Sequence, residues 1–169
     1  MKNALLIGFG TILAGSLWAA PVASQDITVT PGSPSIASFV TAVSQDLDRQ
    51  LERVHLSSRD FGGGFAQVRF QVDDDGQVDK VILYRRSGDG ETDRAALQAV
   101  RRLAPLGALP VGARSDQIIQ ANIIIATSEM QLMQLHRKAA QAEHARLASA
   151  DEPQERAVIA LTVSGNPSS

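Results

Sequence analysis

An alternating run in the middle of the chain limits its fold more than any other feature. Between residues 65 and 72 apolar and polar side chains alternate, with Ala66, Val68, Phe70 and Val72 on one side and Gln67, Arg69 and Gln71 on the other. Because successive side chains of a strand point to opposite faces, the run predicts a half-buried β-strand. Asp75-Gly76 follows, a strong hairpin signal, and residues 78–85 read as a second strand. The chain therefore contains an antiparallel β-hairpin.

The second strand of this hairpin has an irregular pattern. Val78, Val81 and Leu83 cannot all face the core unless the strand contains a bulge. If Val81 and Leu83 face inward, Ile82 and Tyr84 lie on the open face. Two apolar side chains would then be exposed side by side.

The hairpin is flanked by helical patterns and followed by another strand. Apolar residues between Ile36 and Val54 recur every three or four positions, which predicts an amphipathic helix of about five turns beginning near Pro34. A second helix is predicted over residues 93–103, and residues 117–127 alternate as a third strand. The fold expected is a small two-layer α+β domain, a three-stranded antiparallel sheet with both helices on one face.

The two ends of the chain differ in kind from this domain. Residues 1–24 have a cationic start, an apolar run and small residues at the end, which predicts a cleaved signal peptide and a periplasmic protein with no membrane span after cleavage; an uncleaved inner-membrane anchor facing the periplasm is the alternative. Residues 25–33 read as a linker, and residues 34–127 as the folded domain. Ser128 and Gln131 form a capping pattern that begins a helical extension and tail, residues 128–169. Within it, residues 156–163 could form one more short strand, and so cap the edge of the sheet.

The sequence predicts no catalytic, metal or cofactor site. Asp73, Asp75 and Gly76 match three positions of an EF-hand calcium loop, but Gln71 and Ile82 stand where its first and last carboxylates belong. The acidic stretch is therefore predicted to be a turn. There is no cysteine, the histidines have no common zinc spacing, and neither a nucleophile elbow nor a P-loop lysine is present. The net charge of −2 and the 4% aromatic content argue against nucleic acid as a partner.

The middle of the chain is similar to a known family. The stretch FAQVRFQVDDDGQVDKVILYRRSGDGETDRAALQAVRRLAPLGALP, followed by the alternating strand, resembles the C-terminal domain of the TonB/TolA energy-transducer family. The resemblance implies a non-catalytic periplasmic module that binds an extended segment of an envelope or outer-membrane protein by adding it as a strand to an open sheet edge. In the family arrangement residues 117–127 would be that edge. The residues expected to contact the partner are Ile118, Gln120, Asn122, Ile124, Ile82 and Tyr84.

The chain also departs from a full energy transducer. Only about eleven residues separate the apolar start from the first helix, a reach of about 40 Å that is too short to cross the periplasm. This favours a stand-alone member of the family. The alternative is a structural subunit or assembly factor of an envelope complex that acts through the C-terminal helix, whose apolar run Met130–Leu135 could also form a homodimer. An enzyme or ligand carrier that uses the Gly62–Gly64 and Ser87–Gly90 loops is disfavoured, because no acid–base pair or metal set supports it.

Overall fold

The structure is a computed structural model that describes residues 34–54, 56, 61–149 and 153–165. The predicted signal peptide and linker lie outside the described residues, and their assignment stays a prediction. In the part of the chain that is described, no helix combines the length and the apolar character that crossing a membrane requires.

The sheet has four strands in the order β2-β1-β3-β4. They are β1 (Gly64–Val72), β2 (Val78–Arg85), β3 (Ile119–Ile125) and β4 (Ile159–Gly165). β1 pairs antiparallel with both β2 and β3, as the three-stranded prediction requires, but β4 then pairs with β3 in parallel. The predicted all-antiparallel sheet of three strands is thus wrong in detail, and the sheet is mixed. A helix that crosses the sheet between β3 and β4 brings the chain back to the same end, which makes the fourth strand parallel.

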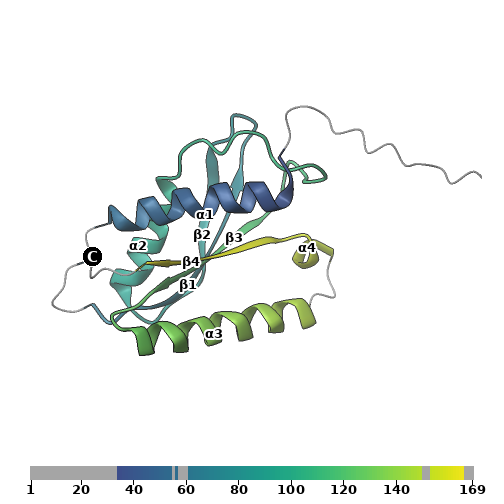
Figure 1. The fold of residues 1–169 in the computed structure, drawn as a ribbon. Helices are drawn as coiled ribbons and strands as arrows, with labels where there is room; N and C mark the ends of the chain where they lie inside the picture. Colours follow the sequence, from purple (N-terminus) through teal and green to yellow (C-terminus); the bar gives the residue numbers. More distant parts are fainter. Residues whose placement is uncertain (1–33, 55, 57–60, 150–152, 166–169) are drawn as a thin grey trace, which may run out of the picture. The chain divides into compact units, whose positions relative to one another are not determined.

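Helices cover both faces of this sheet (Figure 1). α1 (Ile36–Glu52) and α2 (Gly90–Arg101) share one face, whereas α3 (Glu129–Ala148) lies on the other. The short α4 (Pro153–Arg156) leads into β4. The α+β class is therefore confirmed, but α3 adds a third layer to the predicted two.

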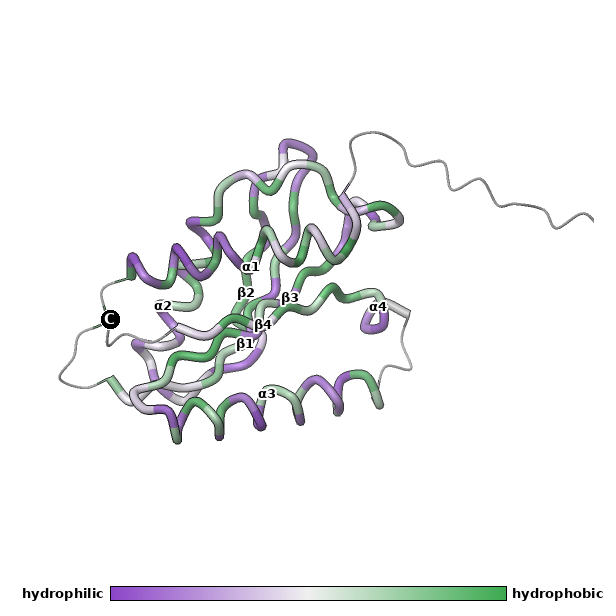
Figure 2. Tube along the Cα trace, in the orientation of Figure 1, coloured by the Kyte–Doolittle hydropathy of each residue, from purple (hydrophilic) through white to green (hydrophobic). Residues whose placement is uncertain are grey.

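The larger core lies between the sheet and the pair α1 and α2. α1 contributes Phe39, Val43 and Leu47, which are buried at the spacing that the sequence predicts. The first three strands supply inward side chains such as Val68, and β4 adds Ile159, Leu161 and Val163 to the same cluster. Figure 2 shows this apolar interior in green. Because β4 shares this core with α1, the tail is part of the folded unit.

A smaller apolar cluster holds α3 against the opposite face. Phe65 of β1, Ile124 of β3 and Ala139 of α3 are buried together, with Leu132 and Leu135 packed beside them. Ala139 is the one fully buried side chain of α3. The helix begins as predicted, since the Ser128 hydroxyl accepts a hydrogen bond from Gln131 N–H at 3.3 Å.

The acidic stretch forms the predicted turn. Asp73 Oδ1 accepts hydrogen bonds from Asp75 N–H and Gln77 N–H at 3.0 and 2.7 Å. Gly76 has a φ of +78°, and a Cβ there would lie 2.8 Å from Gly107 N. Only glycine fits both the backbone conformation and this close approach.

The predicted bulge in the second strand is also present. The β1–β2 register shifts between Arg69 and Gln71, opposite Lys80, whose φ is +50°. As a result Val78, Val81 and Leu83 all pack against the core. Ile82 and Tyr84 are left 55% and 51% exposed.

Candidate functional site: the open edge of the sheet

The strand that was predicted to form the open edge is internal. β3 pairs with β1 on one side and with β4 on the other, so the assignment of residues 117–127 as the edge is wrong. Gln120, Asn122 and Ile124 are buried, and Ile118 is half-buried. Their contact with a partner stays an untested prediction, but in this structure β4 occupies the place that a partner strand would take. Of the six predicted residues, only Ile82 and Tyr84 are well exposed.

The buried polar residues of β3 are satisfied by other strands. Gln67 Nε2 donates to Asn122 Oδ1 at 2.8 Å, and Arg69 Nε donates to Gln120 Oε1 at 2.9 Å. Asn122 Nδ2 donates to Thr162 Oγ1 of β4 at 3.4 Å. Buried polar groups need such partners, and here the bonds join β1, β3 and β4 on the face covered by α3. These hydrogen bonds explain why polar side chains are buried here, because they hold the three strands together.

An ion-pair network extends this layer toward α4. Arg69 Nη1 and Nη2 donate to the two carboxylate oxygens of Glu155, each at 2.8 Å. These bonds lower the pKa of Glu155, although burial opposes the shift. Arg146 of α3 donates to the Glu155 carbonyl oxygen and to the Glu143 carboxylate. The guanidinium of Arg69 also lies 3.5 Å from the centre of the Tyr84 ring, a cation–π contact. Tyr84 is therefore held in place although it is half exposed.

Two edges of the sheet remain, and the β2 edge is poorly suited to pairing. It carries Asp79, Lys80 and Arg85, and it contains the bulge at Lys80. Charged side chains and bulges are the common devices by which an edge strand resists the addition of another strand. The exposed Ile82 and Tyr84 lie on the face of this strand.

The β4 edge has the opposite character. Residues 157–165 contain no charged side chain, and the pairing of β4 with β3 is regular from Ile159 to Gly165. Ile159 N–H donates to Ile118 O, and Gly165 O accepts from Ala126 N–H. Since alternate residues of a parallel strand bond to the same neighbour, Ala160, Thr162 and Ser164 direct their backbone N–H and C=O groups away from β3. Among the described residues, these groups have no backbone partner.

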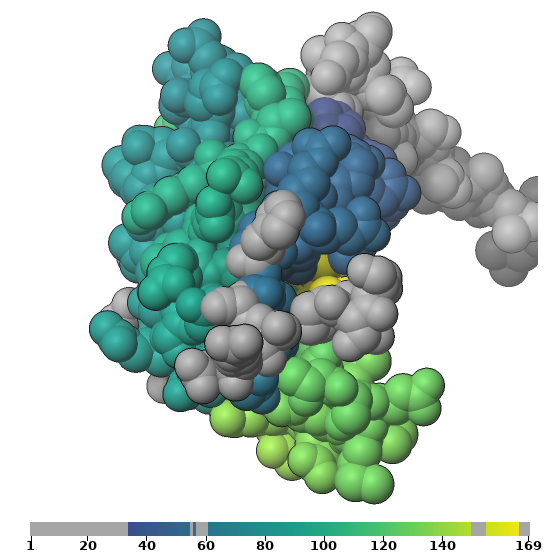
Figure 3. Space-filling model, turned by 90° about the vertical axis from the view of Figure 1, so that its left-hand side faces the viewer, coloured from purple at the N-terminus to yellow at the C-terminus, as the bar shows by residue number. Residues whose placement is uncertain are grey.

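A cleft leads to this edge. In Figure 3, β4 is visible in yellow between α1 in blue and α3 in green. At the start of β4 lies a hollow of about 520 Å³ whose lining includes Ile36, Val40, Val111, Val158 and Ala160. Ile36 and Val111 are 53% and 62% exposed. Apolar side chains, together with Gln117 and Arg156, thus line a cavity beside the open edge of β4.

Two acidic residues, Asp48 and Glu52, lie near the end of α1, on the part of the helix surface that is turned away from α2. Asp46 faces the opposite flank, because its Oδ2 accepts from Ala104 N–H at 2.8 Å. Asp48 is two residues on, about 200° around the helix, and so points away from α2. Burial, and then the like charge of Glu52 one turn later, raise the pKa of Asp48. No ion pair of Asp48 or Glu52 occurs within the described part of the chain.

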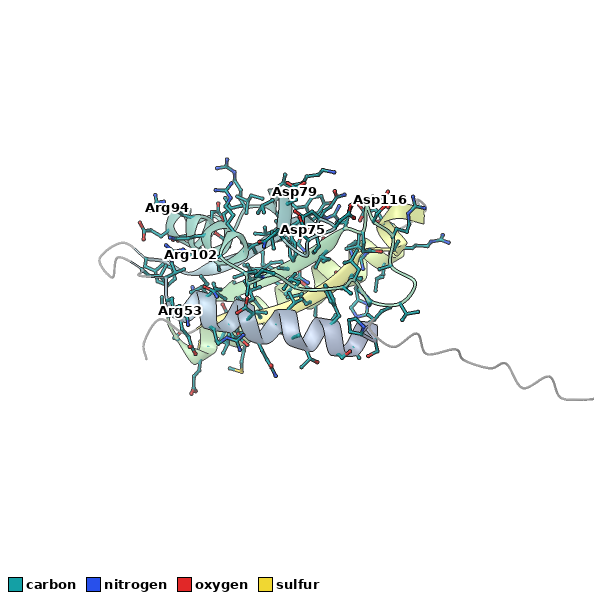
Figure 4. The ribbon with its side chains drawn as sticks, turned by 90° about the horizontal axis from the view of Figure 1, so that it is seen from above. Arg53, Asp75, Asp79, Arg94, Arg102 and Asp116 are labelled. Atoms are coloured by element: carbon teal, nitrogen blue, oxygen red, sulfur yellow. The ribbon has the colours of Figure 1, made fainter. Side chains whose placement is uncertain are left out.

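In Figure 4, Arg53, Arg94 and Arg102 lie at one end of the molecule, and Asp75, Asp79 and Asp116 lie away from that end. Arg114 pairs with Asp116 at 2.8 Å and lowers its pKa. Within the described residues, no three histidine or carboxylate side chains are grouped so as to hold a metal ion.

The comparisons with known proteins agree with this geometry in part. A family model described as TonB C terminal matches residues 36–123, more than half of the chain. The match begins with α1 and ends within β3, so it does not include α3, α4 or β4. No curated protein and no solved structure matches the chain.

Proposed function

This chain belongs to the TonB C-terminal family, and we propose that it is a non-catalytic periplasmic module that binds an extended segment of an envelope protein as an added strand. Domains of this family are interaction modules that bind envelope or outer-membrane proteins. The periplasmic location rests on the family and on the predicted signal peptide. The segment would add to the open edge of β4, in the cleft between α1 and α3.

The observation that carries this proposal is the unpaired, uncharged edge of β4. Its outward backbone groups can form a ladder with another strand, and the regular pairing on its inner side keeps it straight. The β2 edge offers neither property, because a bulge and three charged residues interrupt it.

Displacement of β4 by a partner is a weaker explanation. Such a partner would have to remove Ile159, Leu161 and Val163 from the core, where each is less than a tenth exposed. Burial of one such side chain stabilises by about 1.5–3 kcal/mol, so the three together contribute on the order of 5 kcal/mol or more. An incoming segment would also have to replace the Arg69–Glu155 bonds. Addition at the outer edge avoids both costs.

The experiment uses a single backbone N–H. Thr162→Pro removes an N–H that points outward but leaves the backbone bonds to β3, and proline is tolerated at such a position of an edge strand. Thr162→Ala is the matched control, because it removes the same hydroxyl but keeps the N–H. Full-length protein with a photo-crosslinker at residue 160 is exposed to the envelope fraction.

Strand addition predicts a crosslinked partner with the parent protein and with Thr162→Ala, and at least a tenfold loss with Thr162→Pro. Circular dichroism would check that both variants keep the fold. Equal crosslinking of the two variants would reject the β4 edge as the binding site.

A second candidate is an assembly factor that acts through α3. Met130, Met133 and Leu147 are exposed on this helix, and methionine-rich surfaces adapt to several partners. Replacement of Met130 and Met133 by Ser should then abolish binding or self-association, whereas Thr162→Pro should not. The opposite pattern favours the β4 edge.

A further inference from the structure

We infer that the segment bound at the β4 edge carries a bulky apolar residue and a basic residue about four positions apart, the first entering the hollow beside Val40 and the second facing Asp48. This inference rests on the proposed function, because it names the chemistry of the partner that the same edge would bind.

The hollow at the start of β4 accounts for the apolar residue. Its apolar lining comes from Ile36 and Val40 of α1, Val111 of the loop before β3, and Val158 and Ala160 next to the edge, and its polar lining from Gln117 and Arg156. Val111 N–H donates to Pro34 O, which holds this loop against the start of α1. A volume of about 520 Å³ accommodates a leucine or an aromatic side chain. A side chain that covers Ile36 and Val111 would remove two large exposed apolar groups from water.

The carboxylates of Asp48 and Glu52 account for the basic residue of the bound segment. Asp48 and Glu52 are one turn apart with like charges, and neither has an ion pair within the described residues. The strand β4 has no charged side chain that could neutralise these two carboxylates. A lysine or arginine on the bound segment would relieve the repulsion between the two carboxylates, whereas an acidic residue would add to it.

The spacing follows from the directions of the two elements. The start of α1 and the start of β4 share the hollow, and Leu51 near the end of α1 lies beside Gly165 at the end of β4. α1 and β4 therefore run in the same direction (Figure 1). Val40 and Asp48 are about 12 Å apart along a helix with a rise of 1.5 Å per residue. An extended segment covers this distance in about four residues, and residues four apart point to the same face of a strand.

The test is a selection of displayed random twelve-residue segments on the full-length chain in detergent. The expected result is an enrichment of segments with Leu, Ile, Phe or Tyr three to five positions from Lys or Arg. Individual peptides from the selection are then measured against variants. Asp48→Asn with Glu52→Gln should weaken them at least fivefold, and Val111→Ser should weaken them similarly. Asp74→Asn, at the exposed turn, is the matched charge control and should change nothing.

The outcomes separate this inference from the proposed function. Segments that lose binding with Thr162→Pro but show no basic preference, or no response to the Asp48 and Glu52 changes, would overturn the inference and leave strand addition standing. Segments that bind Thr162→Pro as well as the parent, or no enrichment over an unrelated protein, would overturn both. Two other occupants would also reject the inference. Binding only after removal of residues 1–33 would identify the chain's own start as the occupant, and a dimer that Thr162→Pro dissociates would identify a second copy.

Discussion

Arg69 of β1 and Glu155 of α4 form a two-point ion pair, with both N–O distances at 2.8 Å, immediately before the chain enters β4. The Arg69 side chain is 8% exposed, and Glu155 is 32% exposed. The pair links the start of β4 to β1, an inner strand of the sheet. It spans β3, which lies between β1 and β4 in the sheet.

Removal of the carboxylate should destabilise the protein. Glu155→Ala leaves a nearly buried guanidinium with Gln120 as its remaining neutral acceptor, and we expect a loss of about 1–3 kcal/mol in the free energy of unfolding. Urea denaturation measures the loss. The matched control is Asp116→Ala, which breaks the exposed pair with Arg114 and should cost clearly less, because solvent screens an exposed ion pair. Equal losses for the two variants would contradict a structural role for the buried pair.

Low pH should weaken the Arg69–Glu155 ion pair. Because the hydrogen bonds from Arg69 lower the pKa of Glu155, the folded state binds this proton less readily than the unfolded state. The stabilisation is therefore complete above the unfolded pKa of about 4.3, and it is lost as pH falls through the lower folded pKa. The free energy of unfolding, measured from pH 6 to pH 3, should fall more steeply for the parent protein than for Glu155→Gln. Parallel curves would show that Glu155 does not contribute.

Asp48 should behave in the opposite way. Burial and the charge of Glu52 raise its pKa, so its ionised form is less favourable in the folded protein than in the unfolded one. This penalty is present above the folded pKa and disappears below the unfolded value. At pH 7, Asp48→Asn should raise Tm by up to about 2 °C, because surface changes rarely exceed half a kcal/mol. A lower Tm would mean that Asp48 has a stabilising partner. If Asp48→Asn raises Tm and also weakens peptide binding, Asp48 is kept for binding at the expense of stability, which is a stability–function trade-off.

Local patterns made much of this fold predictable. The turn at Asp73–Gly76 and the bulge at Lys80 each follow from neighbours within a few residues. The alternation of Val68 and Phe70 likewise gave the face of β1 that packs against α1 and α2, but the prediction of a half-buried strand was wrong, because Gln67 and Arg69 on the other face are buried as well. These features depend on local backbone chemistry and on one side of a strand, which a single sequence contains.

The pairing of β4 could not be derived in the same way. Residues 159–163 alternate as a strand, with Ile159, Leu161 and Val163 buried, but nothing local states which edge they join. A parallel partner reached through α3 is a long-range choice, decided by the burial of these three side chains against α1.

The error at β3 followed from treating its edge as open, although residues 156–163 were a possible strand that could cap the sheet, as β4 does. Gln120 and Asn122 were predicted to contact a partner, on a strand face that no helix of the expected two-layer fold covers. A signal was present, since Gln67 and Arg69 stand on the polar side of β1 and meet Asn122 and Gln120 directly. Polar residues that face each other on two neighbouring strands are compatible with a buried hydrogen-bonded layer, and not only with a solvent-exposed face.

The tail should be indispensable for folding. Leu161 is 3% exposed in the core that β4 shares with α1, so Leu161→Ala should lower the free energy of unfolding by about 2–4 kcal/mol. Met133→Ala, at an exposed position on α3, is the control and should change it by less than about 0.5 kcal/mol.

A chain truncated after Ala148 should lose cooperative unfolding or aggregate, because β3 would expose its edge and α1 would lose part of its packing. Thermal melts followed by circular dichroism measure both effects. If the truncated chain melts as cooperatively as the parent, the part of the chain that ends at Ala148 folds without β4, and β4 is a removable cap over β3.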